Sequence, residues 1–136
     1  MIDTPEQLLN KLLADSIFMG FVGLYEFTDG TEADSIAILG SSEYVDGLSS
    51  VDGLEVVISR VPSATSTQIY SGCTPTHKSW TLHLIQYQSG NEAMTAADYL
   101  VQLYPGTTYS NLGAESMSEV AGVAQVAVTI PANVNL

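Results

Sequence analysis

Two spacings of apolar residues alternate along this chain of 136 residues. In some segments every second residue is apolar, as in a half-buried β-strand, and in others apolar residues recur every three or four positions, as in an amphipathic helix. Both spacings occur in succession between Ser79 and Pro105, which reads as a strand, a turn containing Gly90 and a helix. We therefore expect the rest of the fold to be organised around this segment.

The strand is predicted from Ser79 to Gln88. One face of this strand carries Trp80, Leu82 and Leu84. We expect this face to point into the core, because large apolar residues recur there at every second position. The opposite side carries Thr81, His83, Ile85 and Tyr87.

The helix that follows is predicted to begin after Asn91, whose side chain can accept a bond from an unpaired backbone N–H, and to end at Pro105. Glu92 suits the positive end of the helix dipole. The apolar stripe consists of Ala93, Ala96, Ala97, Leu100, Leu103 and Tyr104. Its small alanines would let the helix lie close to a sheet.

An N-terminal helix is indicated by Thr4 as the cap, Pro5 at the first helical position and Gln7 reaching back to complete a capping box. It is expected to run to about Ser16. Its apolar stripe consists of Leu8, Leu9, Leu12 and Leu13.

The remaining elements are predicted strands. Gly20–Thr28 and Ser35–Leu39 would form a hairpin joined by the acidic loop Asp29–Asp34. Further strands are expected at Leu54–Arg60, within the polar arm Ser63–Thr76, at Thr107–Tyr109 and at Gly122–Ile130. Together these elements predict an α+β fold, with two helices packed on one mainly antiparallel sheet, in a single domain covering residues 1–136.

The chain is strongly acidic, which limits the partners that it can bind. Asp and Glu number 15 and Lys and Arg number 3, for a net charge of −12. Lys11, Arg60 and Lys78 are the only Lys or Arg residues, so the surface is expected to repel nucleic acid and anionic membranes. We expect no signal peptide at the N-terminus and no transmembrane segment.

Candidate catalytic groups are sparse. His77 and His83 lack a nucleophile-elbow motif, and Cys73 is the only cysteine, which excludes an internal disulfide. The carboxylates of Asp29, Glu32 and Asp34 do not match a calcium loop. We therefore expect no enzyme activity, cofactor or metal, and keep a small metal-binding or hydrolytic enzyme using these carboxylates, His77 and Cys73 as the alternative.

Several segments, in this order and spacing, resemble the bacteriophage tail terminator, or tail-completion, protein family. The resemblance covers nearly the whole chain. It is carried by the capped first helix, Gly53–Pro62, Trp80–Tyr87, Ala96–Leu100, the Tyr104-Pro105-Gly106 stop and the final strand.

The resemblance implies a structural protein of the virion that assembles as a ring, typically a hexamer. Such a ring caps the head-proximal end of the tail tube, stops tube polymerisation and docks to the neck connector or stopper. Its partners would be copies of itself, the tail tube protein and the connector, and it would reside in the virion after assembly in the host cytoplasm. Another neck or tail-tube subunit is the alternative within the same class.

The acidic net charge is consistent with a ring around a channel, because carboxylates that line a lumen repel DNA and let it pass without binding. Contacts around a closed ring are head-to-tail. The polar arm and the acidic loop are the candidate surfaces for neighbours or lumen, and the three cations are candidates for salt bridges between subunits. The interface or lumen candidates are Asp29, Glu32, Asp34, Arg60, Thr67 and Lys78.

Overall fold

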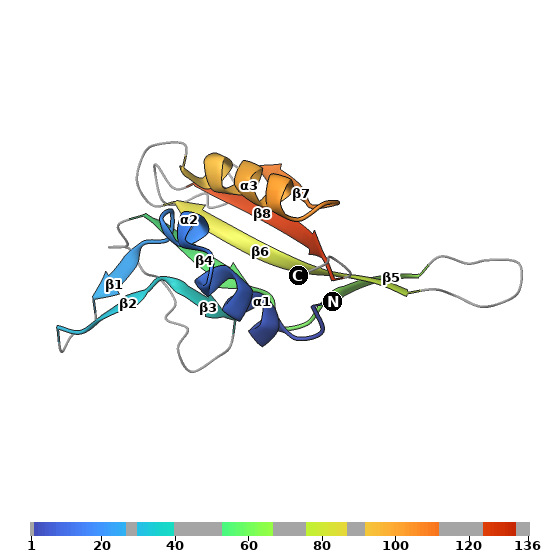
Figure 1. Ribbon diagram of the computed structural model, residues 1–136, viewed down its shortest axis with the longest axis horizontal. Helices are drawn as coiled ribbons and strands as arrows, with labels where there is room; N and C mark the ends of the chain where they lie inside the picture. The colour runs from blue at the N-terminus through green and yellow to red at the C-terminus, as the bar shows by residue number, and fades with distance from the viewer. Residues whose placement is uncertain are drawn as a thin grey trace, which may run out of the picture.

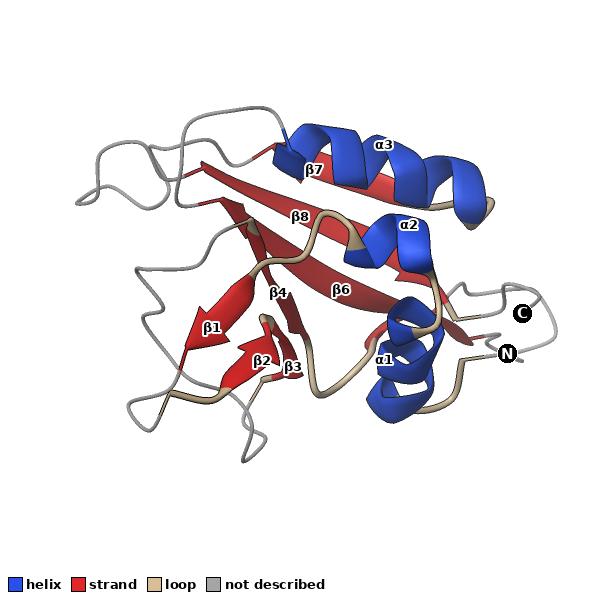
Figure 2. Cartoon of the chain, turned by 60° about the vertical axis from the view of Figure 1, so that its left-hand side comes forward, coloured by secondary structure: helices blue, strands red, loops and turns tan. Residues whose placement is uncertain are grey.

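A mixed β-sheet carries the helices on one of its faces (Figures 1 and 2). The computed structural model describes residues 2–26, 30–39, 53–66, 76–86, 92–111 and 124–132. The helices in these ranges are α1 (Pro5–Leu13), α2 (Ser16–Met19) and α3 (Glu92–Leu103). The strands are β1 (Leu24–Glu26), β2 (Glu32–Asp34), β3 (Ile36–Ile38), β4 (Leu54–Ile58), β5 (Ser63–Ser66), β6 (Thr76–Gln86), β7 (Thr108–Asn111) and β8 (Ala124–Pro131). The predicted α+β class is confirmed.

Strand β6 is the centre of the main sheet, whose order is β3-β4-β6-β8-β7 with β5 also paired to β6. On one side β6 pairs antiparallel with β8 from Ser79 to Gln86, and on the other side with β4 and then β5. The pairing of β3 with β4 is parallel, so the sheet is mixed although most of its pairs are antiparallel.

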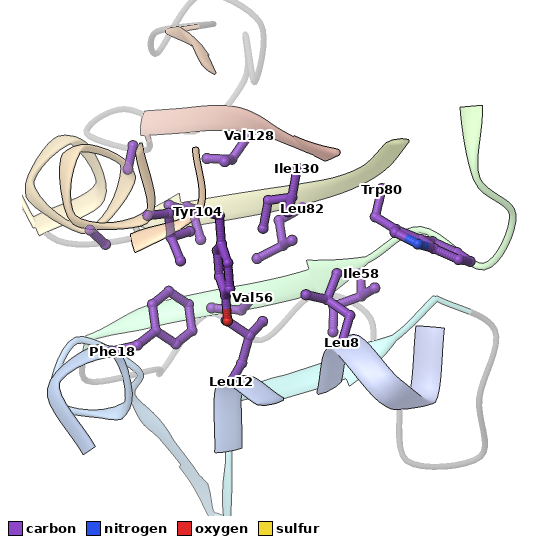
Figure 3. Close-up of a cluster of buried hydrophobic side chains, with 14 of the residues drawn as sticks. Leu8, Leu12, Phe18, Val56, Ile58, Trp80, Leu82, Tyr104, Val128 and Ile130 are labelled. Carbon is purple, nitrogen blue, oxygen red and sulfur yellow. The ribbon is translucent and has the colours of Figure 1, made fainter. Parts of the chain in front are cut away.

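The core lies between this sheet and the helices (Figure 3). Trp80 is 1% exposed, and Leu82 and Leu84 on the same face of β6 are fully buried, as their alternation predicts. Helix α3 contributes the alanines of its predicted stripe together with Leu100, which are also buried. Small side chains there bring the helix close to the sheet, and α3 contacts β6, β7 and β8.

The first turn of α1 is capped much as its sequence predicts. The Gln7 N–H donates to Thr4 Oγ1 at 3.2 Å, while Gln7 Oε1 accepts from the Asp3 N–H at 2.6 Å. The side-chain return of the capping box therefore reaches the residue before the cap, not the cap itself.

The predicted extension of this helix to about Ser16 is wrong. Helix α1 ends at Leu13, and Asp15 caps the separate helix α2 by accepting the N–H groups of Ile17 and Phe18, both at 3.0 Å. A short carboxylate side chain that bonds the backbone just ahead of it competes with continuation of a helix. The same cap starts α2, which lies just before the strand predicted at Gly20–Thr28 and buries Phe18 in the core.

The predicted hairpin exists with a different second strand. Strand β1 pairs antiparallel with β2, in the segment expected to be loop, whereas Ile36–Ile38 joins the main sheet beside β4. The change of direction occurs at Ser35, whose N–H donates to the Gly23 carbonyl and whose carbonyl accepts from the Val56 N–H, each at 2.8 Å. Tertiary pairing thus decides the partner, which local alternation cannot specify.

An arm, defined as β5 with the first part of β6, projects from one end of the sheet (Figure 1). Register places Ser63 opposite Ser79 and Ser66 opposite Thr76. Strand β8 pairs with β6 only from Ser79 onward, so the arm is a two-stranded ribbon beyond that point. The strand predicted within Ser63–Thr76 is confirmed at Ser63–Ser66.

Candidate interface surfaces

The acidic hairpin, defined as the exposed face of β1 and β2, carries an apolar residue among carboxylates. Leu24 lies opposite Asp34, and Glu26 lies opposite Glu32. All four are exposed, Leu24 to 49%. Residues directly opposite on antiparallel strands share one face, where like charges repel. The Glu26–Glu32 pair therefore favours contact with an external cation.

The base of the arm is cationic. Arg60 lies between β4 and β5, Lys78 lies in β6 opposite Ala64, and both are exposed. Val61, beside Arg60, is 73% exposed. Among the residues that the structure describes, no ion pair joins Lys11, Arg60 or Lys78 to a carboxylate.

The helix groove is a hollow of about 440 Å³ where the end of α1, the start of α2 and the end of α3 meet. It is lined by Lys11, Ala14, Asp15, Ser16, Ile17, Leu103 and Tyr104. Its lining is mixed, because the exposed apolar side chains of Ile17 (60%) and Leu103 (39%) lie beside the polar Lys11, Asp15 and Ser16. Leu13, near the end of α1, is exposed to 43%. Large apolar side chains gathered at a hollow are typical of docking sites.

Asp15 fixes the geometry of the helix groove. Besides capping α2, its carboxylate accepts the Tyr99 hydroxyl at 2.7 Å on Oδ2 and 3.0 Å on Oδ1. Burial raises the pKa of Asp15, but hydrogen bonds from the Phe18 N–H, the Tyr99 hydroxyl and the Ile17 N–H outweigh it, so the pKa lies below its usual value. The ionised carboxylate thus ties α2 to α3.

Tyr104 closes the floor of the helix groove. It is 4% exposed, and burial, with smaller contributions from Asp15 and Tyr99, raises its pKa to about 12. The hydroxyl therefore stays protonated across the physiological range.

The other face of the sheet carries polar side chains from its central strands. His83 of β6 is half-buried there, as predicted for a histidine on a sheet face, and Gln125 Nε2 lies 2.7 Å from its Nδ1. An amide nitrogen donates, so Nδ1 accepts and the ring is neutral. Burial lowers the pKa of His83.

The predicted interface residues do not converge on one site. Glu32 and Asp34 lie together in strand β2, not in a loop, and Arg60 and Lys78 lie at the base of the arm. Asp29 and Thr67 lie outside the described residues, as do Cys73 and the side chain of His77.

Sequence reasoning missed the apolar parts of these surfaces. Leu13 and Leu103 were predicted to lie on core-facing stripes, yet both are exposed. Leu24 was predicted to lie in a strand, and no element was predicted at Ile17. One signal was available in α1, which carries two neighbouring pairs of leucines, Leu8–Leu9 and Leu12–Leu13. A narrow apolar stripe buries one residue of each pair. In the structure these are Leu8 and Leu12.

Within the described ranges, no three His, Cys, Asp or Glu residues are grouped so that they could hold a metal ion. None of the helices in those ranges is both long enough and apolar enough to span a lipid bilayer.

Comparison with known proteins gives no match: neither a family model, nor a curated protein, nor a solved structure is significantly similar to this chain.

Proposed function

We propose that this protein is a non-enzymatic structural subunit of a bacteriophage virion. In this proposal it forms a ring that caps the head-proximal end of the tail tube and joins it to the neck connector. The proposal begins from the resemblance of the Gly53–Pro62, Trp80–Tyr87 and Ala96–Leu100 segments to tail terminators.

The projecting arm is the observation that carries the assembly part of the proposal. An isolated two-stranded ribbon is marginally stable in water, because it has no hydrophobic face of its own to bury. From Thr76 to Lys78, β6 is paired with β5 beyond the reach of β8, apart from a bond of 2.9 Å from the Ala132 N–H to the Lys78 carbonyl. Such an arm gains stability when a neighbouring subunit or the tail tube packs against it.

The charges support a channel for DNA. Exposed carboxylates occur on α1 and on α3, whereas the whole chain offers only 3 Lys or Arg residues. A ring of such subunits has an acidic lumen, which repels phosphates and lets DNA slide.

Light scattering coupled to size-exclusion chromatography, together with negative-stain imaging, tests this proposal. Wild-type protein is expected to form closed rings of one size as concentration rises. A matched arm-less variant replaces residues 64–78 with Asn-Gly, which joins the paired residues Ser63 and Ser79 by a two-residue turn. It should keep the circular-dichroism spectrum of the fold and lose the rings.

The opposing outcomes are distinct. Long filaments from the wild type would favour a tail-tube subunit over a terminator. A protein that stays monomeric at high concentration, both alone and with tail tubes, would exclude the ring. Enzyme activity that survives purification and depends on His77 or Cys73 would support the alternative class.

A further inference from the structure

We infer that neighbouring copies of this chain join head-to-tail, with the acidic hairpin of one copy seated in the helix groove of the next. This inference rests on the proposed ring and names the two surfaces that build it. The occupant of the helix groove is thus a second copy of the same chain, entering with Leu24 of its acidic hairpin.

The helix groove has the properties of a socket. It offers about 440 Å³ of space, and Ile17 and Leu103 present apolar surface at its lining. Lys11 supplies a cation that no described carboxylate of its own chain pairs. Asp15 also lines the helix groove, but its oxygens already accept the Tyr99 hydroxyl and the N–H groups of α2.

The acidic hairpin has the matching properties of a plug. Leu24 is an exposed apolar side chain directly opposite Asp34, and the Glu26–Glu32 pair follows on the same face. Seating Leu24 in the helix groove brings these carboxylates towards Lys11. The cation relieves repulsion between Glu26 and Glu32 that an isolated subunit retains.

The two surfaces lie apart on one subunit, which makes the contact head-to-tail. In Figure 2 the acidic hairpin projects at the lower left, whereas the end of α3 and the adjoining ends of α1 and α2 lie towards the right. A plug and a socket at different places cannot satisfy each other within one chain. A repeated contact of this kind closes into a ring when its rotation permits.

Two substitutions, called the blocked variants, each disrupt one of the two surfaces and so test the acidic hairpin and the helix groove separately. Leu24→Asp damages only the acidic hairpin, and Ile17→Asp damages only the helix groove, while both positions are exposed enough to spare the fold. Leu39→Asp, at a leucine exposed to 47% outside both surfaces, is the matched control. Each protein is first checked by circular dichroism, and Leu24→Gln and Ile17→Gln replace any variant that fails to fold.

The expected result is a weaker ring in each blocked variant, with the dissociation constant raised about tenfold or more, because each substitution removes apolar burial from the contact. The Leu39→Asp control should assemble as the wild type does. An equimolar mixture of Leu24→Asp and Ile17→Asp should yield dimers and no rings, because only one intact plug and one intact socket remain per pair.

A charge exchange tests the electrostatic part. Lys11→Glu and Glu32→Lys should each weaken assembly, and the double variant should recover it. Rings that persist in both blocked variants would overturn this inference and leave the proposed function standing. The contacts between subunits would then have to lie elsewhere, for example at Arg60 or Lys78 at the base of the arm. A wild type that forms no ring overturns both.

Discussion

Gly53 packs so closely against Gly23 that a Cβ atom added to Gly53 would lie 2.8 Å from the Gly23 Cα atom. Flanking backbone bonds hold the two segments together: the Gly23 N–H donates to the Leu54 carbonyl at 2.9 Å, and the Leu54 N–H donates to the Phe21 carbonyl at 3.0 Å. The entry to β4 is thereby fastened to the segment that leads into the acidic hairpin.

Gly53→Ala is expected to destabilise the protein by more than about 2 kcal/mol, since it adds a steric clash to backbone strain. Gly53 has a φ of +111°, where L side chains are disfavoured. Gly30→Ala is the matched control, because Gly30 has a φ of +89° but no atom within 4 Å of an added Cβ. Urea unfolding should show the smaller loss for Gly30→Ala, and equal losses would refute the close-packing argument.

Trp80→Ala should cost about 3–5 kcal/mol of unfolding free energy, because it truncates a large and almost fully buried side chain of the core. Trp80 also donates through Nε1 to the Ile2 carbonyl at 2.9 Å, in a buried contact. Trp80→Phe keeps most of the volume and should cost about 1–3 kcal/mol for the orphaned carbonyl. Circular dichroism is the appropriate probe, since Trp80 is the only tryptophan. Unchanged stability in Trp80→Ala would show that β6 is not the packing centre.

His83 should make the fold less stable in mild acid. Its pKa in the folded protein is lowered by burial from the usual 6.5, so the unfolded chain takes up the proton first. Stability is then complete above pH 6.5 and falls as the pH drops from 6.5 towards the folded pKa. Protonation also removes the Nδ1 lone pair that accepts from Gln125.

The measurement compares urea unfolding of the wild type and His83→Gln between pH 5 and about 7.5. The difference in unfolding free energy between the two proteins should shift against the wild type as the pH falls. His77 is present in both proteins, so its titration cancels. A difference that is constant with pH would contradict a neutral, buried His83.

Tyr104 should make the fold sensitive to alkali. Its pKa is raised from 10.0 to about 12, chiefly by burial. The unfolded chain therefore loses this proton first, and stability should decline as the pH rises from 10 towards 12. Tyr104→Phe should show a shallower decline, measured by thermal unfolding, and its helix groove should keep its shape because the ring is retained.

Segments that carry their own periodicity were predictable. The alternation around Trp80 and the alanine stripe of α3 each mark one buried face. The spacing of apolar residues within each segment is therefore enough to predict the strand and the helix.

Elements that depend on distant pairing were not predictable. Strand β2 has the acidic sequence Glu-Ala-Asp and little β-propensity, and it forms because β1 lies beside it. The parallel register of β3 with β4 likewise depends on a tertiary contact. The helix groove was missed because exposed leucines in amphipathic helices look like core residues.

Continuity of β6 from the arm into the core has a mechanical consequence. A pull on the arm acts along β6, which lies between β4 and β8 with an antiparallel ladder on each side. Force along the strand loads these hydrogen bonds in shear, so many must break together instead of one after another. A subunit held by its arm would therefore resist extension stiffly, because the loaded strand is also the central strand of the main sheet.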